Sequence, residues 1–142
     1  MEIIERSYKA QVEELQDLLS FLEDFLMLHH VSIKDTMVVN VAVEEIFVNI
    51  ASYAYRDVEN KGTKITIVYD NGVLTIEFVD WGVPFDPLAK EDPDVKAKIE
   101  DRGIGGLGIY MVKKSMDECS YERKDNQNVF VIRKKLKINE QN

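Results

Sequence analysis

The chain has 142 residues, of which 45% are hydrophobic and 31% charged, so disordered, collagen-like and membrane-spanning classes are excluded and one domain over residues 1–142 is expected. Its net charge of −8 has the wrong sign for binding nucleic acid or an anionic membrane, which leaves proteins and small molecules as partners. The single cysteine, Cys119, excludes a disulfide framework and a zinc site of paired cysteines. Together with an amino terminus that lacks a signal-like apolar run, this predicts a cytoplasmic protein.

Hydrophobic periodicity predicts one strand and two helices in the first part of the chain. A weakly alternating segment over residues 1–9 indicates the strand, and apolar residues at three- and four-residue spacing over 11–30 indicate an amphipathic helix. Ser32 with Asp35 resembles a capping box that starts a second helix over 33–56, a range without Gly or Pro. This helix is apolar nearly all round, so we expect it to be central.

Hairpin signals dominate the second part. Asn71-Gly72 is a strong turn signal between two β-branched runs, and residues 125–128 are expected to form a second turn. The predicted elements are strands at 64–69, 73–79, 119–123 and 129–135 and a helix at 109–116. This order predicts an α+β fold, a two-layer α/β sandwich whose mixed, mostly antiparallel sheet carries its helices on one face.

Two polar side chains interrupt the apolar second helix. Glu45 and Asn49 are four residues apart and share one face, and Tyr53 continues the same line. Burying a carboxylate and an amide costs free energy unless they are paired or ligate something. The alternative is that Glu45 lies at an exposed edge beside Glu44.

A third polar side chain ends a predicted strand. In this strand Leu74, Ile76 and Phe78 point to one face, and period two places Asp80 on that same apolar face. A carboxylate held there, with Gly82 following, suits a fixed acceptor for a ligand's donor. A turn-initiating aspartate is the alternative.

A glycine-rich segment precedes the last predicted helix. Residues 103–108 satisfy G-x-G-x-x-G, but no strand precedes them and too little chain follows for a dinucleotide-binding fold; the chain also lacks a P-loop. Glycines still permit close backbone approach, and amides at a helix start attract anionic oxygens, with Arg102 as an adjacent cation. A simple turn remains the alternative.

Three segments occur in order along the chain: Glu45-x-x-x-Asn49, Asp80-x-Gly82-x-Pro84-Phe85-Asp86-Pro87, and Gly105-Gly106-Leu107-Gly108. Together they resemble the N, G1 and G2 boxes of the GHKL (Bergerat-fold) ATPases. They are most similar to the small anti-sigma-factor serine/threonine kinases of the RsbW/SpoIIAB type. The resemblance covers nearly the whole chain, and the joint spacing is far more specific than any one box.

The resemblance implies a role for each matching residue. Asn49 would coordinate Mg²⁺ and help to bind ATP, and Glu45 would be the general base for the attacking hydroxyl. Asp80 would accept a hydrogen bond from the adenine amino group, while Gly82 would let the purine lie against the backbone. Residues 88–102 would form a lid over the triphosphate. The other residues expected to bind the nucleotide are Pro84, Phe85, Arg102, Gly103, Gly105, Gly106, Leu107 and Gly108.

The resemblance also implies a function. The chain would be an ATP- and Mg²⁺-dependent protein serine/threonine kinase that acts as an anti-sigma regulatory factor, binding a sigma factor or similar target and phosphorylating a small anti-anti-sigma (STAS-type) antagonist. A non-catalytic ATP-binding module that sequesters a partner is the alternative, although mere nucleotide binding needs no base such as Glu45. A plain interaction domain without nucleotide is a third possibility.

A homodimer is expected near the amino terminus. The apolar stripe of the first helix, from Leu15 to Met27, is wide, and the family resemblance points the same way. The alternative is that the stripe is wholly consumed by the intramolecular core.

Two positions depart from the family's pattern. Tyr53 stands where members often have histidine, and Asn128-Val129-Phe130 stand where many have a Gly-Thr pair. The first change could alter a phosphate contact and the second the back of the nucleotide pocket. Neither removes the expected base or metal ligand.

Overall fold

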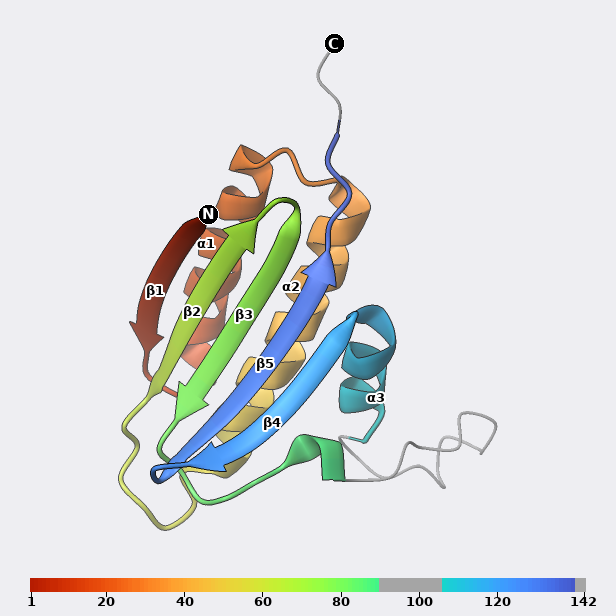
Figure 1. The fold of residues 1–142 in the computed structure, drawn as a ribbon. Coiled ribbons are helices and arrows are strands. Elements are labelled where there is room, and N and C mark those ends of the chain that lie inside the picture. The colour runs from red at the N-terminus through yellow and green to blue at the C-terminus, as the bar shows by residue number, and fades with distance from the viewer. Residues whose placement is uncertain (90–105, 140–142) are drawn as a thin grey trace.

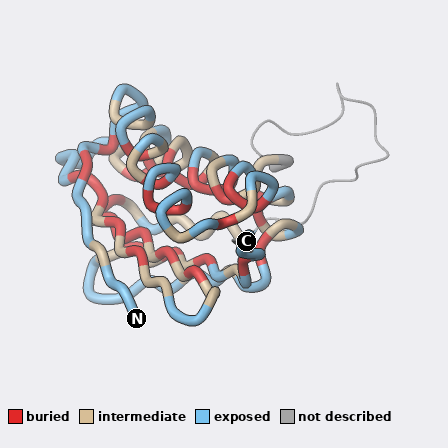
Figure 2. The backbone as a smooth tube through the Cα atoms, turned by 90° about the horizontal axis from the view of Figure 1, so that it is seen from above, coloured by how far each residue is buried: buried red, intermediate tan, exposed pale blue. Residues whose placement is uncertain are grey.

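A computed structural model, which describes residues 1–89 and 106–139, shows a five-stranded sheet with helices packed on one face (Figures 1 and 2). The strand order is β1-β2-β3-β5-β4, and every neighbouring pair in the described residues is antiparallel. The expected element order and two-layer class are confirmed, with an antiparallel rather than mixed sheet. The elements are β1 (Glu2–Tyr8), η1 (Val12–Glu14), α1 (Leu15–Leu28), α2 (Ile33–Asn49), η2 (Ile50–Ala54), β2 (Thr63–Asp70), β3 (Val73–Asp80), η3 (Pro87–Ala89), α3 (Gly106–Ser115), β4 (Glu118–Lys124) and β5 (Gln127–Lys135).

Helix α1 directs its apolar stripe at the sheet. Leu18, Leu22 and Leu26 are at most 1% exposed, whereas Met27 and Leu28 at the end of the helix are exposed. Much of the stripe is therefore used within the chain. The homodimer stays a prediction.

Helix α2 begins where the sequence predicts. The Ser32 hydroxyl accepts a hydrogen bond from the backbone N–H of Asp35 at 3.2 Å, which caps the helix start. The helix ends in a π-helical turn, η2. Such turns widen the backbone spiral and often occur at functional sites, and this one adjoins Asn49.

The span Ile33–Ala54 has the length and apolar composition to cross a membrane, with a mean hydropathy of 1.3. In the fold, one side of this helix faces the sheet, where Val39 and Phe47 are fully buried. Apolar residues of α2 therefore pack in the core, as predicted for a central helix.

Both hairpins are closed by two-residue turns in the left-handed region. The turn residues Asn71-Gly72 have φ values of 51° and 80°, and Asp125-Asn126 have 51° and 63°. Turns of this kind match the right-handed twist of the flanking strands. The second turn is therefore shorter than predicted. Strand β5 begins at Gln127, so Asn128 lies in the strand and not in the turn.

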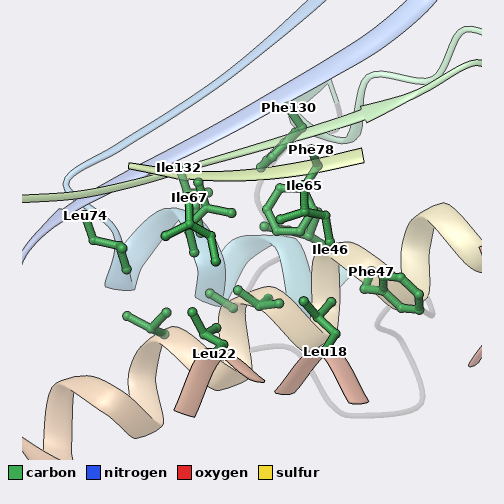
Figure 3. Close-up of a cluster of buried hydrophobic side chains, with 14 of the residues drawn as sticks. Leu18, Leu22, Ile46, Phe47, Ile65, Ile67, Leu74, Phe78, Phe130 and Ile132 are labelled. Atoms are coloured by element: carbon green, nitrogen blue, oxygen red, sulfur yellow. The ribbon is translucent and has the colours of Figure 1, made fainter. Parts of the chain in front are cut away.

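The core fills the space between the helices and the sheet (Figure 2). Burial of such side chains stabilises the fold by about 1.5–3 kcal/mol each. The buried side chains labelled in Figure 3 are Leu18, Leu22, Ile46, Phe47, Ile65, Ile67, Leu74, Phe78, Phe130 and Ile132. As the alternation in β3 predicts, Asp80 continues the buried face of that strand.

Candidate functional site

One pocket lies where the end of α2 meets β3, β5 and α3. It encloses about 400 Å³ of empty space, counting the part open to solvent, and its walls are mostly apolar. A concave apolar pocket with a few converging polar groups is typical of a small-molecule site. The polar side chains lining it are Asn49, Asp80, Tyr121 and Asn128. The fold thus brings Asn49 and Asp80, which come from a helix and a strand, to one place.

Asp80 is the buried carboxylate of this pocket, with 4% exposure. Its Oδ1 accepts two hydrogen bonds, from the backbone N–H of Gly82 at 2.9 Å and from Nδ2 of Asn128 at 2.8 Å. Burial raises the pKa of Asp80, while these two bonds and the charge of Arg123 act in the opposite direction. Both bonds from the described residues reach Oδ1, so Oδ2 can accept from a ligand.

Asn128 joins Asp80 to the loop that follows β3. Besides its bond to Asp80, Nδ2 donates to the carbonyl of Val83 at 2.8 Å. Its Oδ1 accepts from the backbone N–H of Phe85 at 3.3 Å and from the Tyr121 hydroxyl. The sequence identifies Asn128 only as a departure from the family's pattern at the back of the pocket. It does not identify Tyr121 as a site residue.

Gly82 packs directly on the end of the central helix. The N–H of Val83 donates to the Ala54 carbonyl at 2.7 Å, and a β-carbon on Gly82 would collide with that carbonyl oxygen. Nearby, the Tyr55 hydroxyl accepts from the N–H of Trp81 at 3.0 Å. Gly82 is therefore required by backbone packing, and its expected place beside a purine stays a prediction.

Aromatic rings border the same loop. The rings of Tyr53 and Phe85 lie 5.6 Å apart at 30°, and the guanidinium of Arg56 lies 5.1 Å from the centre of the Tyr53 ring. Phe85 lines the pocket, whereas Pro84 is exposed and lies outside the lining, in which Pro87 takes part instead; nucleotide binding by Phe85 stays a prediction.

Glu45 points at the first turn of α3. A β-carbon on Gly108 would collide with Glu45 Oε2 and would come within 2.7 Å of its Cδ. Glu45 is partly buried while its neighbour Glu44 is exposed. The structure therefore places Glu45 at the contact between α2 and α3, and not at an exposed edge.

The predicted glycine segment lies partly within the described residues. Gly106, Leu107 and Gly108 form the first turn of α3. The predictions for Arg102, Gly103 and Gly105 lie outside the described residues, as do residues 90–102 of the expected lid.

The close contacts at Gly82 and Gly108 predict stability effects of different size. Gly82→Ala forces a methyl group against a backbone carbonyl, so we expect a loss of about 1–3 kcal/mol, as for overpacking. Gly108→Ala meets only the end of a long side chain and raises helix propensity, so its unfolding free energy should change by less than about 1 kcal/mol. Urea denaturation of both variants measures the difference. Equal losses would contradict these contacts.

Comparison with known proteins relates most of the chain to an ATPase domain family and to a protein kinase. A family model described as histidine kinase-like ATPase domain matches residues 8–134. The serine/threonine-protein kinase BtrW of Bordetella bronchiseptica is 23% identical over 112 residues, which make up 79% of this chain and 79% of BtrW.

Two solved structures share the fold. A crystal structure of the RsbU and RsbW domains of a Mycobacterium tuberculosis protein matches 96% of this chain with a TM-score of 0.69 and 12% identity. This chain spans only 33% of that longer one. The Acinetobacter baumannii histidine kinase AdeS matches 96% of this chain and 69% of its own with a TM-score of 0.50 and 10% identity.

Proposed function

The chain belongs to the histidine kinase-like ATPase domain family, and from this premise we propose that it is an ATP-dependent protein serine/threonine kinase of the anti-sigma type. Membership confirms the resemblance to GHKL ATPases and implies ATP binding. The kinase name of BtrW and the RsbW domain among the structural matches support the finer assignment. The observation that carries the proposal is that Asn49 and Asp80 line one pocket while Glu45, one turn from Asn49, lies against α3.

The pocket's residues suit an adenine nucleotide. Oδ2 of Asp80 takes neither of the two internal bonds and would accept from an exocyclic amino group, and the apolar walls, which include Ile46 and Phe130, suit the faces of a base. At the other side, the first turn of α3 offers backbone N–H groups of the kind that bind anionic oxygens. Bound ATP would supply the phosphoryl group.

Asn49 is the proposed protein ligand for Mg²⁺. Amide oxygens suit this hard cation, and the described residues contain no group of three His, Cys, Asp or Glu that could hold a metal alone. Phosphate oxygens and water would therefore complete the coordination shell.

Asn49→Ala tests this assignment. We expect it to weaken nucleotide binding by at least about tenfold when Mg²⁺ is present, because an oxygen ligand is lost, and to change binding little in EDTA. Calorimetric titration with ATP under both conditions measures the two constants. Equal weakening with and without Mg²⁺ would show that Asn49 contacts something other than the metal.

Glu45 is the proposed base. It would take the proton from a serine or threonine hydroxyl as that oxygen bonds to the γ-phosphorus and the bond from phosphorus to the bridging oxygen of ADP breaks. The contact with Gly108 holds the Glu45 carboxylate beside the segment expected to line the phosphates. Positioning of this kind is the main requirement of phosphoryl transfer.

The anti-sigma assignment defines the proposed partners. The phosphate acceptor would be a small anti-anti-sigma (STAS-type) protein, and the regulated target would be a sigma factor or a similar protein. We place the protein in the cytoplasm, as a homodimer, with neither nucleic acid nor membrane as a direct partner.

Transfer of labelled γ-phosphate to a candidate antagonist encoded nearby is the direct test. The wild-type protein should label the antagonist in the presence of Mg²⁺, and an antagonist whose acceptor hydroxyl is removed should stay unlabelled. Nucleotide binding without transfer to any candidate would support the non-catalytic module instead. Absence of nucleotide binding would refute both functions.

A further inference from the structure

We propose that Asn128 is a positioning residue, which orients the Asp80 carboxylate and the loop of residues 82–85 for recognition of the nucleotide base. Only the identity of the ligand rests on the proposed function, since the contacts themselves are made without it. Asn128 is 5% exposed, and none of its amide atoms is spare, because Nδ2 donates twice and Oδ1 accepts twice.

The sheet register brings this group together. Asp80 of β3 is paired with Asn128 of β5, which is paired in turn with Arg123 of β4. Nδ2 of Asn128 lies 2.8 Å from both Asp80 Oδ1 and the Val83 carbonyl, so one amide group ties the carboxylate to the loop. A threonine at this position would have a single hydroxyl proton and could not donate to both.

The consequence concerns the direction of the carboxylate. Because Asn128 and the N–H of Gly82 both donate to Oδ1, these bonds favour one orientation of the Asp80 carboxylate and leave Oδ2 available to a ligand. The bond from the N–H of Phe85 to Asn128 also holds the backbone of a residue that lines the pocket. Removing the Nδ2 donor should therefore weaken binding through Asp80 and the loop, because both Nδ2 bonds are made within the protein.

The Asn128→Asp variant tests whether Asn128 acts through the hydrogen bonds that Nδ2 donates or only through the volume of its side chain. The side chain keeps its shape and its Oδ1 acceptor, but it places a second carboxylate oxygen against Asp80. Two carboxylates at this distance cannot both be ionised, so the pair retains a proton to higher pH than an ordinary carboxyl group. That proton restores the bond to Asp80, and its loss replaces the bond with repulsion.

Within the described residues, the other ionisable groups that act on this pair come from three segments of the chain. Tyr121 and Arg123 lie on β4, Tyr55 follows η2, and Asp86 lies in the loop before η3. Arg123 donates to the carbonyl of Gly82 at 2.8 Å and offsets part of the added charge. Because these groups are present in both proteins, the comparison uses the ratio of variant to wild type at each pH.

The binding test is a titration with MgADP at pH 5.5 and at pH 8. We expect the ratio of Kd for Asn128→Asp to Kd for wild type to rise by about tenfold or more between these values, since one unit of pKa shift corresponds to a factor of ten. Asn126→Asp adds the same charge at an exposed position of the same hairpin, outside the lining of the pocket, so its ratio should stay near one at both pH values. A ratio for Asn128→Asp that is independent of pH would overturn the proposal.

A second measurement needs no nucleotide. In the folded Asn128→Asp variant, the two carboxyl groups at positions 80 and 128 bind more protons above about pH 4 than they do in the unfolded chain. The Tm of the variant should therefore fall further below the Tm of wild type as the pH rises. Adding Asp80→Asn removes the second carboxylate and should remove this pH-dependent part. A deficit that does not change with pH would refute the pairing. If wild type binds no nucleotide, the proposed function fails, while this measurement still decides whether Asn128 orients Asp80.

Discussion

Asp80→Asn will abolish nucleotide binding in a protein that remains folded. Asparagine keeps an Oδ1 that accepts from Gly82 and Asn128, so the internal network survives. At the position of Oδ2, however, it presents an NH₂ group to the amino group of adenine, and two donors then face each other. Loss of a charged hydrogen bond together with an unsatisfied donor corresponds to a weakening of about 100-fold or more. Titration with MgATP and MgADP measures it, and unchanged affinity in the folded variant would refute the role of Asp80.

The same substitution should make the protein without nucleotide more stable near neutral pH. Burial raises the pKa of Asp80 above its unfolded value, so the native state binds more protons than the unfolded state, and stability falls as the pH rises through this window. The Asp80→Asn variant has no carboxyl group at this position, so its stability does not fall in this way. Its Tm advantage should therefore be largest near pH 7 and should shrink toward pH 4. The opposite trend would show that the ionised carboxylate stabilises the fold.

Glu45→Gln will reduce phosphate transfer by about 10²-fold to 10⁴-fold, the usual contribution of a general acid or base. Glutamine retains the shape that packs on Gly108 but cannot take a proton from the acceptor hydroxyl. Binding of MgATP should stay nearly intact, because Glu45 is not among the residues lining the pocket. Single-turnover transfer and nucleotide titration separate the two effects, and Glu45→Ala should behave in the same way.

A matched control stands next to Glu45 in the chain. Glu44 is exposed on the same helix, and Glu44→Gln removes an equal charge without touching α3, so its transfer rate should match wild type. A comparable loss in both variants would indicate a general electrostatic effect. Loss of MgATP binding in Glu45→Gln would refute the separation between base and nucleotide ligands.

The local sequence determined the elements and the faces on which candidate residues lie. Alternation in β3 placed Asp80 in phase with Phe78, because successive side chains of a strand point to opposite faces. Helical spacing placed Asn49 one turn from Glu45, and the pocket and the contact with α3 lie along that line. The capped start of α2 and the Asn71-Gly72 turn likewise depend on neighbouring residues, so local pattern was sufficient to predict them.

The tertiary structure alone decided which of these faces meet. Asn128 is the partner of Asp80 for two reasons: the two-residue turn at Asp125-Asn126 sets the β4–β5 register, and β5 lies between β3 and β4 in the sheet. Pairing between strands that are far apart in the chain leaves no local sequence pattern. The requirement for glycine at position 82 comes from the Ala54 carbonyl in the same way. By itself the sequence determined the chemistry of each candidate residue and, for Asn49 and Asp80, the face that the residue occupies. The geometry of the site depends on long-range packing, which joins residues far apart in the chain and could not be derived from spacing.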